Sequence, residues 1–302
     1  MSGSINFVHR KDDAIQKVRE ILNNNNAENV TENESGGYGI KFSWGNAKPS
    51  SLVLYYNGKG DSTKIVFEKS TDEIIKWFTS IAPLQGKIPK FDTRIGTDES
   101  GKGDYFGPLV VAGVFADRNI EEKLIAIGVC DSKKNTFKQN QRMAEEIKTA
   151  LKPEQYSVIY ISNEKYNELY AKLNNLNTLL AWGHARVIEN LLEKNKCENI
   201  IADQFGNERY IKDALLERGR GANLFQTPRA ESDTAVAAAS ILARDTYVRL
   251  MENLCELYGL DLPKGASGAV DEAARIAVKE KGADFLRKVA KLHFKTTQKV
   301  IC

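Results

Sequence analysis

Acidic side chains at the ends of two expected strands are the residues of this 302-residue chain best suited to chemistry. Asp98 and Glu99 stand side by side where one strand ends, and Asp203 directly follows the apolar run 199–202. Because open α/β sheets bind ligands at their strand ends, we expect these carboxylates to converge. Clustered carboxylates repel one another unless cations neutralise them, and oxygen ligands without histidine suit Mg²⁺ or Mn²⁺. Two such ions about 4 Å apart form a site that hydrolyses phosphodiesters.

A fourth carboxylate is expected from the segment that precedes a long helix beginning at Thr234. Glu231 and Asp233 both lie in that segment. Asp233 alone would also suit the N-cap of the helix, and Glu231 alone would suit a solvated surface. The sequence therefore leaves the fourth ligand open between these two residues.

Strands and helices that alternate along residues 89–302 must position these side chains. This alternation predicts a layered α/β domain with a mixed sheet. The strands are expected over residues 93–97, 109–115, 156–162 and 199–202. The helices are expected over residues 137–151, 177–194, 234–257 and 269–290.

Residues 1–88 predict a separate, small α+β domain. Apolar residues at helical spacing predict a helix over 11–22, and alternating residues predict strands over 38–44, 52–56 and 64–68. Ser70 and Glu73 suit a capping box for a second helix. The turn signals are Lys48–Pro49–Ser50 and Asn57–Gly58, and the linker signals are Pro83, Gly86 and Pro89.

The composition is that of an ordinary globular protein. Lys and Arg number 43 against 40 Asp and Glu, 42% of the residues are hydrophobic and 27% are charged, which excludes a wholly disordered chain. No apolar run approaches the roughly 18 residues of a membrane span, and residues 1–10 lack the apolar core of a signal peptide. None of the four cysteines has CxxC spacing, so we expect no structural zinc site and reduced thiols. We therefore expect a cytoplasmic protein.

The segment 94–110, which reads RIGTDESGKGDYFGPLV, resembles the first motif of type 2 ribonucleases H. Its Gly-Lys-Gly turn resembles ribonuclease HIII, since ribonuclease HII usually has Gly-Arg-Gly there. The resemblance extends over about residues 90–300. Further segments that look like family motifs are 131–134, 175–177, 181–185, 237–241, 262–265 and 293–297. By position and α+β pattern, residues 1–88 match the family's N-terminal domain, which is similar to half a TATA-binding protein.

The resemblance implies a ribonuclease H fold and an endonuclease that cleaves the RNA strand of RNA/DNA hybrids, leaving 5′-phosphate and 3′-hydroxyl ends. It implies two Mg²⁺ or Mn²⁺ ions held by four carboxylates, which by position are Asp98, Glu99, Asp203 and Asp233. The turn Gly101–Lys102–Gly103 would bring its backbone close to the RNA 2′-hydroxyls. Ser100 would add a hydroxyl contact, while Lys102 and Lys133 would hold phosphates. We expect a monomer in which residues 1–88 bind substrate.

Two other functions are compatible with the sequence. One is a ribonuclease HII-like enzyme that cuts at single embedded ribonucleotides, which the Gly-Lys-Gly turn and the front domain disfavour. The other is a non-enzymatic hybrid-binding protein, which the intact Asp98, Glu99 and Asp203 disfavour. His184 is expected to have a packing or capping role.

Overall fold

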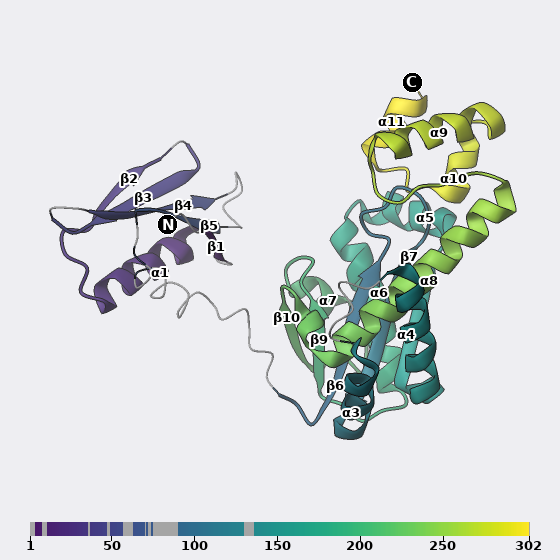
Figure 1. Ribbon diagram of the computed structural model, residues 1–302, viewed down its shortest axis with the longest axis horizontal. Helices are drawn as coiled ribbons and strands as arrows, with labels where there is room; N and C mark the ends of the chain where they lie inside the picture. Colours follow the sequence, from purple (N-terminus) through teal and green to yellow (C-terminus); the bar gives the residue numbers. More distant parts are fainter. Residues whose placement is uncertain are drawn as a thin grey trace. The chain divides into compact units, whose positions relative to one another are not determined.

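The computed structural model describes residues 4–7, 11–35, 37–46, 49–56, 63–69, 71, 74, 90–129 and 136–301. The chain divides into two compact units, Met1–Lys87 and Ile88–Cys302, which are shown in Figure 1 and described separately below. No helix of the described residues is apolar over enough of its length to cross a membrane. Some residues named above lie outside the described ones, namely Lys48, Asn57, Gly58, Ser70, Glu73, Pro83, Gly86, Pro89 and Lys133.

The first unit is a five-stranded antiparallel sheet with a helix packed on one face. The strand order is β1-β5-β4-β3-β2. Helix α1 places Ala14, Val18 and Ile21 against Phe42 and Phe67 of the sheet, and all five are fully buried. The three predicted strands are confirmed as β3, β4 and β5. The elements are β1 (Ser4–Phe7), α1 (Lys11–Asn24), β2 (Thr31–Glu34), β3 (Gly39–Trp44), β4 (Ser50–Tyr56) and β5 (Thr63–Lys69).

The second unit contains a mixed sheet with the strand order β10-β9-β6-β7-β8. Strands β6, β7 and β8 pair antiparallel, whereas β9 and β10 run parallel to β6. This is the α/β class expected from the sequence. The strands are β6 (Thr93–Ser100), β7 (Leu109–Asp117), β8 (Tyr156–Ile161), β9 (Asn199–Asp203) and β10 (Asn223–Thr227).

Helices cover both faces of this sheet. Helix α8 packs along β6 and β7, and a Cβ atom added to Gly96 would collide with the α8 backbone at Val236. Helix α6 packs on the other face, where a Cβ atom on Gly113 would collide with Val187. The helices are α3 (Arg118–Ile127), α4 (Phe137–Ala150), α5 (Asn163–Leu173), α6 (Leu176–Leu192), α7 (Arg209–Ala214), α8 (Thr234–Tyr258), α9 (Gly268–Lys281), α10 (Leu286–Val289) and α11 (Lys295–Ile301). Short 3₁₀ turns lie at η2 (Pro153–Gln155), η3 (Ala230–Ser232) and η4 (Ala283–Phe285).

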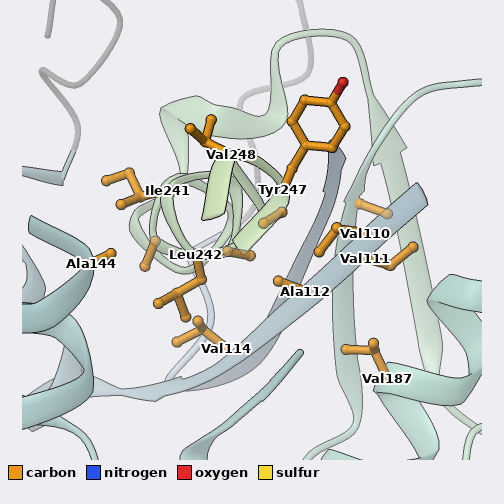
Figure 2. Packing of buried hydrophobic residues seen from close by; sticks show 14 of the residues in the cluster. Val110, Val111, Ala112, Val114, Ala144, Val187, Ile241, Leu242, Tyr247 and Val248 are labelled. Carbon is orange, nitrogen blue, oxygen red and sulfur yellow. The ribbon is translucent and has the colours of Figure 1, made fainter. Parts of the chain in front are cut away.

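Small residues let α8 lie close to the sheet. Its first turns bury Ala235, Ala237, Ala238 and Ala239, and Ala is the strongest helix former. Further along, Figure 2 shows Ile241, Leu242 and Ala144 on one side of β7 and Val187 on the other. The helix ends at Gly259, whose φ of 66° suits a left-handed C-cap.

The helix predicted over 269–290 is two helices in the structure. Gly282 has a φ of 84°, which ends α9 and leads through η4 into the four-residue α10. After α10, Ala290 forms an isolated β-bridge with Phe106, so the C-terminal segment lies against the turn that follows β6.

Candidate active site

The parallel pairing of β6 and β9 brings two of the predicted carboxylates to the same edge of the sheet. Thr97 pairs with Ala202, and the next residues along the two strands are Asp98 and Asp203. The charge of Asp203 contributes to the electrostatic environment of Asp98, and the charge of Glu99 contributes to that of both. Asp98, Glu99 and Asp203 therefore form one carboxylate cluster, which we call the strand-end cluster.

Asp98 points to the α8 face of the sheet. Its carboxylate accepts a hydrogen bond from the Glu99 backbone N–H at 2.8 Å, and the Ser240 side chain on α8 acts to lower its pKa. Burial, together with the charges of Glu99 and Asp203, nevertheless raises the pKa of Asp98 to about 7. The carboxyl group is thus poised to exchange a proton for a cation.

Glu99 points to the opposite, α6 face, as expected for the next residue of a strand. His184 Nε2 donates to Glu99 Oε2 at 3.1 Å, and His184 Nδ1 lies 2.9 Å from Thr97 Oγ1. Lys102 Nζ donates to the other oxygen, Glu99 Oε1, at 3.3 Å. Burial favours a higher pKa for Glu99, but the hydrogen bond from His184 and the charges of His184 and Lys102 hold that pKa below its usual value. The ring of Phe205 packs beside both His184 and Lys102.

Asp203 is linked to the segment that precedes α8. Its Oδ1 accepts a hydrogen bond from the Ala230 backbone N–H at 3.0 Å. Burial and the negative charges of Glu231 and Glu99 raise the pKa of Asp203, against the effect of that hydrogen bond. The structure thus brings Glu231 into the electrostatic range of the strand-end cluster.

Asp233 is bound to the start of α8 and to Arg94 rather than to the strand-end cluster. Asp233 Oδ1 caps α8 by accepting from the backbone N–H groups of Ala235 and Val236, at 2.9 and 3.2 Å. Asp233 Oδ2 pairs with the guanidinium of Arg94, near the start of β6. Both carboxylate oxygens of Asp233 are therefore engaged. The N-cap alternative noted from the sequence is confirmed.

The turn after β6 combines one glycine that the protein requires with one that it does not. Gly101 has a φ of 89°, and a Cβ atom there would lie 2.9 Å from the Tyr247 ring. A Cβ atom on Gly103 would meet no protein atom within 4 Å. Ser100 is half-buried at the last position of β6. The apex of the turn is open to an incoming ligand.

The donor set fits hard divalent cations, because it consists of carboxylate oxygens without thiolates. Within the described ranges, no three His, Cys, Asp or Glu side chains are already arranged around a common metal position. Lys102 lies against Glu99 and supplies part of the positive charge that the cluster needs. A bound cation would relieve the mutual repulsion that raises the pKa of Asp98 and Asp203.

For two residues of the site, the sequence did not predict an effect on the carboxylates. His184 was expected to pack or cap, and it is fully buried, but its contact with Glu99 was missed. Ser240 lies within the family-like segment 237–241, which gave no indication of an effect on Asp98. The contact of His184 could have been predicted from its position on the helix expected over 177–194, because a helix that covers the sheet can direct a side chain toward a strand end.

The mixed sheet and its strand-end cluster define a ribonuclease H-like nuclease. A family model described as Ribonuclease HII matches residues 95–297. One curated relative is Ribonuclease HIII of Protochlamydia amoebophila, which is 44% identical over 69% of this chain and 68% of the relative. Another is Ribonuclease HIII of Chlamydia pneumoniae, which is 43% identical over 82% of this chain and 81% of the relative. The chain belongs to the ribonuclease HIII family. The crystal structure of Bst-RNase HIII in complex with Mn²⁺ matches with a TM-score of 0.66 at 28% identity, covering 100% of this chain and 98% of that one.

Proposed function

We propose that this protein is an endonuclease that hydrolyses the RNA strand of RNA/DNA hybrids and leaves 5′-phosphate and 3′-hydroxyl ends. The observation that carries the proposal is the strand-end cluster of Asp98, Glu99 and Asp203, in a chain of the ribonuclease HIII family. The complex described for Bst-RNase HIII supports the use of a divalent cation. We propose two ions, either Mg²⁺ or Mn²⁺.

Four side chains would hold these ions, namely Asp98, Glu99, Asp203 and Glu231. We favour Glu231 over Asp233 as the fourth ligand, because the charge of Glu231 acts on Asp203 whereas Asp233 pairs with Arg94 near the start of β6. When bound, the cations supply Lewis-acid activation of water and stabilisation of the leaving oxygen. His184 holds Glu99 in the orientation needed for this ligand set.

The turn Ser100–Gly103 would recognise the RNA strand. No described residue lies within 4 Å of a Cβ atom added to Gly103, so we infer that the absent side chain makes room for a ribose. The 2′-hydroxyl distinguishes RNA from DNA in the minor groove of a hybrid. Lys102 lies at the edge of the cluster. When substrate binds, its ammonium group would leave Glu99 and bind a phosphate of the substrate instead.

A cleavage assay on an end-labelled RNA/DNA hybrid, with and without EDTA, tests this function. We expect cleavage that requires Mg²⁺ or Mn²⁺ and that falls by orders of magnitude in Asp98→Asn and Asp203→Asn, while hybrid binding survives. A DNA duplex with a single embedded ribonucleotide is the comparison substrate. Preferred cutting at that ribonucleotide would favour the ribonuclease HII-like alternative, and EDTA-resistant cleavage would contradict the metal site.

The first unit, Met1–Lys87, would serve as an additional substrate-binding domain. The face of its sheet opposite α1 carries Lys41, Tyr55 and Lys64, which lie on adjacent strands. Tyr55 and Lys64 are exposed. Exposed basic and aromatic side chains on one sheet face suit phosphate contacts and stacking.

A further inference from the structure

The turn between β6 and β7 has little hydrogen bonding of its own. Its one internal backbone bond, from Asp104 N to Gly101 O, is 3.4 Å long. Its conformation must therefore be fixed by groups that lie outside it. This matters because the apex of this turn is the proposed reader of the RNA strand.

A single residue of the C-terminal segment binds three carbonyls of the turn. Lys291 Nζ donates to Asp104 O at 2.8 Å and to Gly107 O at 2.6 Å. The Lys291 backbone N–H donates to Tyr105 O at 2.8 Å. These bonds hold the returning arm of the turn, directly after the Gly101–Lys102–Gly103 apex.

The surroundings of Lys291 are built for this contact. The side chain is fully buried and lies over the ring of Tyr166. Within residues 90–129 and 136–301, Lys291 takes part in no ion pair, so its ammonium group depends on backbone carbonyls. A buried lysine without a carboxylate partner is costly and is kept only where its contacts are needed.

Three further hydrogen bonds hold Asp104 and the returning arm. Asn163 Nδ2 also donates to Gly107 O, at 2.8 Å, and Tyr247 OH donates to Phe106 O at 3.1 Å. Gly265 N donates to the Asp104 carboxylate at 2.6 Å. Lys291 is the residue that joins several of these carbonyls at once.

We propose that Lys291 is a positioning residue that sets the Gly101–Lys102–Gly103 apex for recognition of the RNA strand. This inference rests on the proposed function, because it assumes that the apex reads the ribose. Lys291 itself touches no substrate. Losing its side-chain bonds frees the returning arm, and small displacements of positioning groups weaken recognition strongly.

The test compares Lys291→Met with Lys288→Met, a matched removal of an exposed lysine three residues earlier on α10. Binding is measured in EDTA, so that no strand is cut, to a short RNA/DNA hybrid and to the DNA duplex of the same sequence. For Lys291→Met we expect hybrid affinity to fall by roughly tenfold or more, with a smaller loss for the DNA duplex. Lys288→Met should keep the wild-type ratio of the two affinities. Calorimetry with Mn²⁺ should give equal affinities for both variants, because the strand-end cluster is untouched.

A milder variant covers the case in which Lys291→Met does not fold. Asn163→Ala removes one of the two donors to Gly107 O and should shift the ratio in the same direction by a smaller factor. A folded Lys291→Met or Asn163→Ala with the wild-type ratio would overturn the inference. If wild-type protein itself fails to prefer the hybrid, the proposed function fails instead, and the two failures are thereby distinguished.

Discussion

Arg94 and Asp233 form a buried ion pair that fastens the start of α8 to the start of β6. The same guanidinium also binds Glu121 at 2.6 Å and Thr234 Oγ1 at 2.7 Å. Asp98 lies four residues further along β6, about 13 Å at the usual rise of a strand, and Ser240 on α8 acts to lower its pKa. The pair therefore positions α8 from the end of β6 remote from the strand-end cluster.

This placement separates the roles of Asp233 and Glu231. Asp233→Asn keeps a good N-cap but loses the ionic bond to Arg94, so we expect a loss of about 1.5–3 kcal/mol in the free energy of unfolding with near-normal kcat. Glu231→Gln should lower kcat by orders of magnitude. Urea unfolding and single-turnover cleavage of the two variants check this. The reverse pattern would return Asp233 to the ligand set.

His184 should control metal affinity through Glu99. His184→Ala removes the donor to Glu99 Oε2, and loss of such a supporting bond weakens metal binding by about tenfold to a hundredfold. Calorimetric titration with Mn²⁺ in the absence of substrate measures this directly. His293→Ala is the matched control, since His293 is exposed and stacks on Tyr170. Equal Mn²⁺ affinities in the two variants would show that the His184 contact is only packing.

The two glycines of the substrate turn should respond differently to alanine. Gly101→Ala meets both a positive φ and the Tyr247 ring, so it should cost about 1–3 kcal/mol in the free energy of unfolding. Gly103→Ala meets no protein atom, so stability should change by less than about 0.5 kcal/mol. Gly103→Ala should instead weaken hybrid binding, because the new methyl group occupies the space proposed for a ribose. Unchanged hybrid affinity in Gly103→Ala would remove the argument for that space.

Lys291 should give the protein a pH-dependent stability. Burial lowers the pKa of Lys291 to about 7, from an ordinary value of 10.5, and Asp104, Tyr166 and His293 are the titratable groups around it. Between these pH values the unfolded chain binds a proton that the folded protein has released, so stability rises with pH. The slope is at most about 1.4 kcal/mol per pH unit. Unfolding at about pH 7 and about pH 9 should show this rise in wild type and in Lys288→Met, and its loss in Lys291→Met.

Removal of the first unit should weaken substrate binding more than chemistry. A tethered binding surface raises the effective concentration of substrate at the active site, so a shortened chain that begins at Lys87 should show a higher KM with a smaller change in kcat. Its binding should also depend less steeply on salt, because phosphate contacts from the unit are lost. Titrations of both proteins over a salt series test this. Equal affinity and equal slope would refute a binding role for residues 1–88.

The sequence predicted the structure best where a short sequence pattern was compatible with only one local structure. The strand expected over 93–97 and the apolar run 199–202 predicted strand ends at Asp98 and Asp203, and the parallel pairing of β6 and β9 brings those ends together. By contrast, the all-exposed strand β2, Thr-Glu-Asn-Glu, has no apolar alternation and could not be predicted. The sequence left Glu231 and Asp233 open as the fourth ligand, because an acidic residue before a helix suits a cap and a ligand equally. The ion pair of Asp233 with the distant residue Arg94, which no local signal predicts, is the observation behind our proposal of Glu231.

The pairing of β6 with β9 has a consequence for the time course of synthesis. Ile95 pairs with Ile200, more than one hundred residues later along the chain, so the site is assembled from non-local contacts, which form slowly. A nascent chain that ends before β9 carries Asp98 and Glu99 without Asp203 or the segment around Glu231. We therefore expect the emerging polypeptide to leave the nucleic acids around it uncut until β9 and the segment around Glu231 have been added to the sheet. Mn²⁺ titration of chains shortened before residue 199 should accordingly detect no binding.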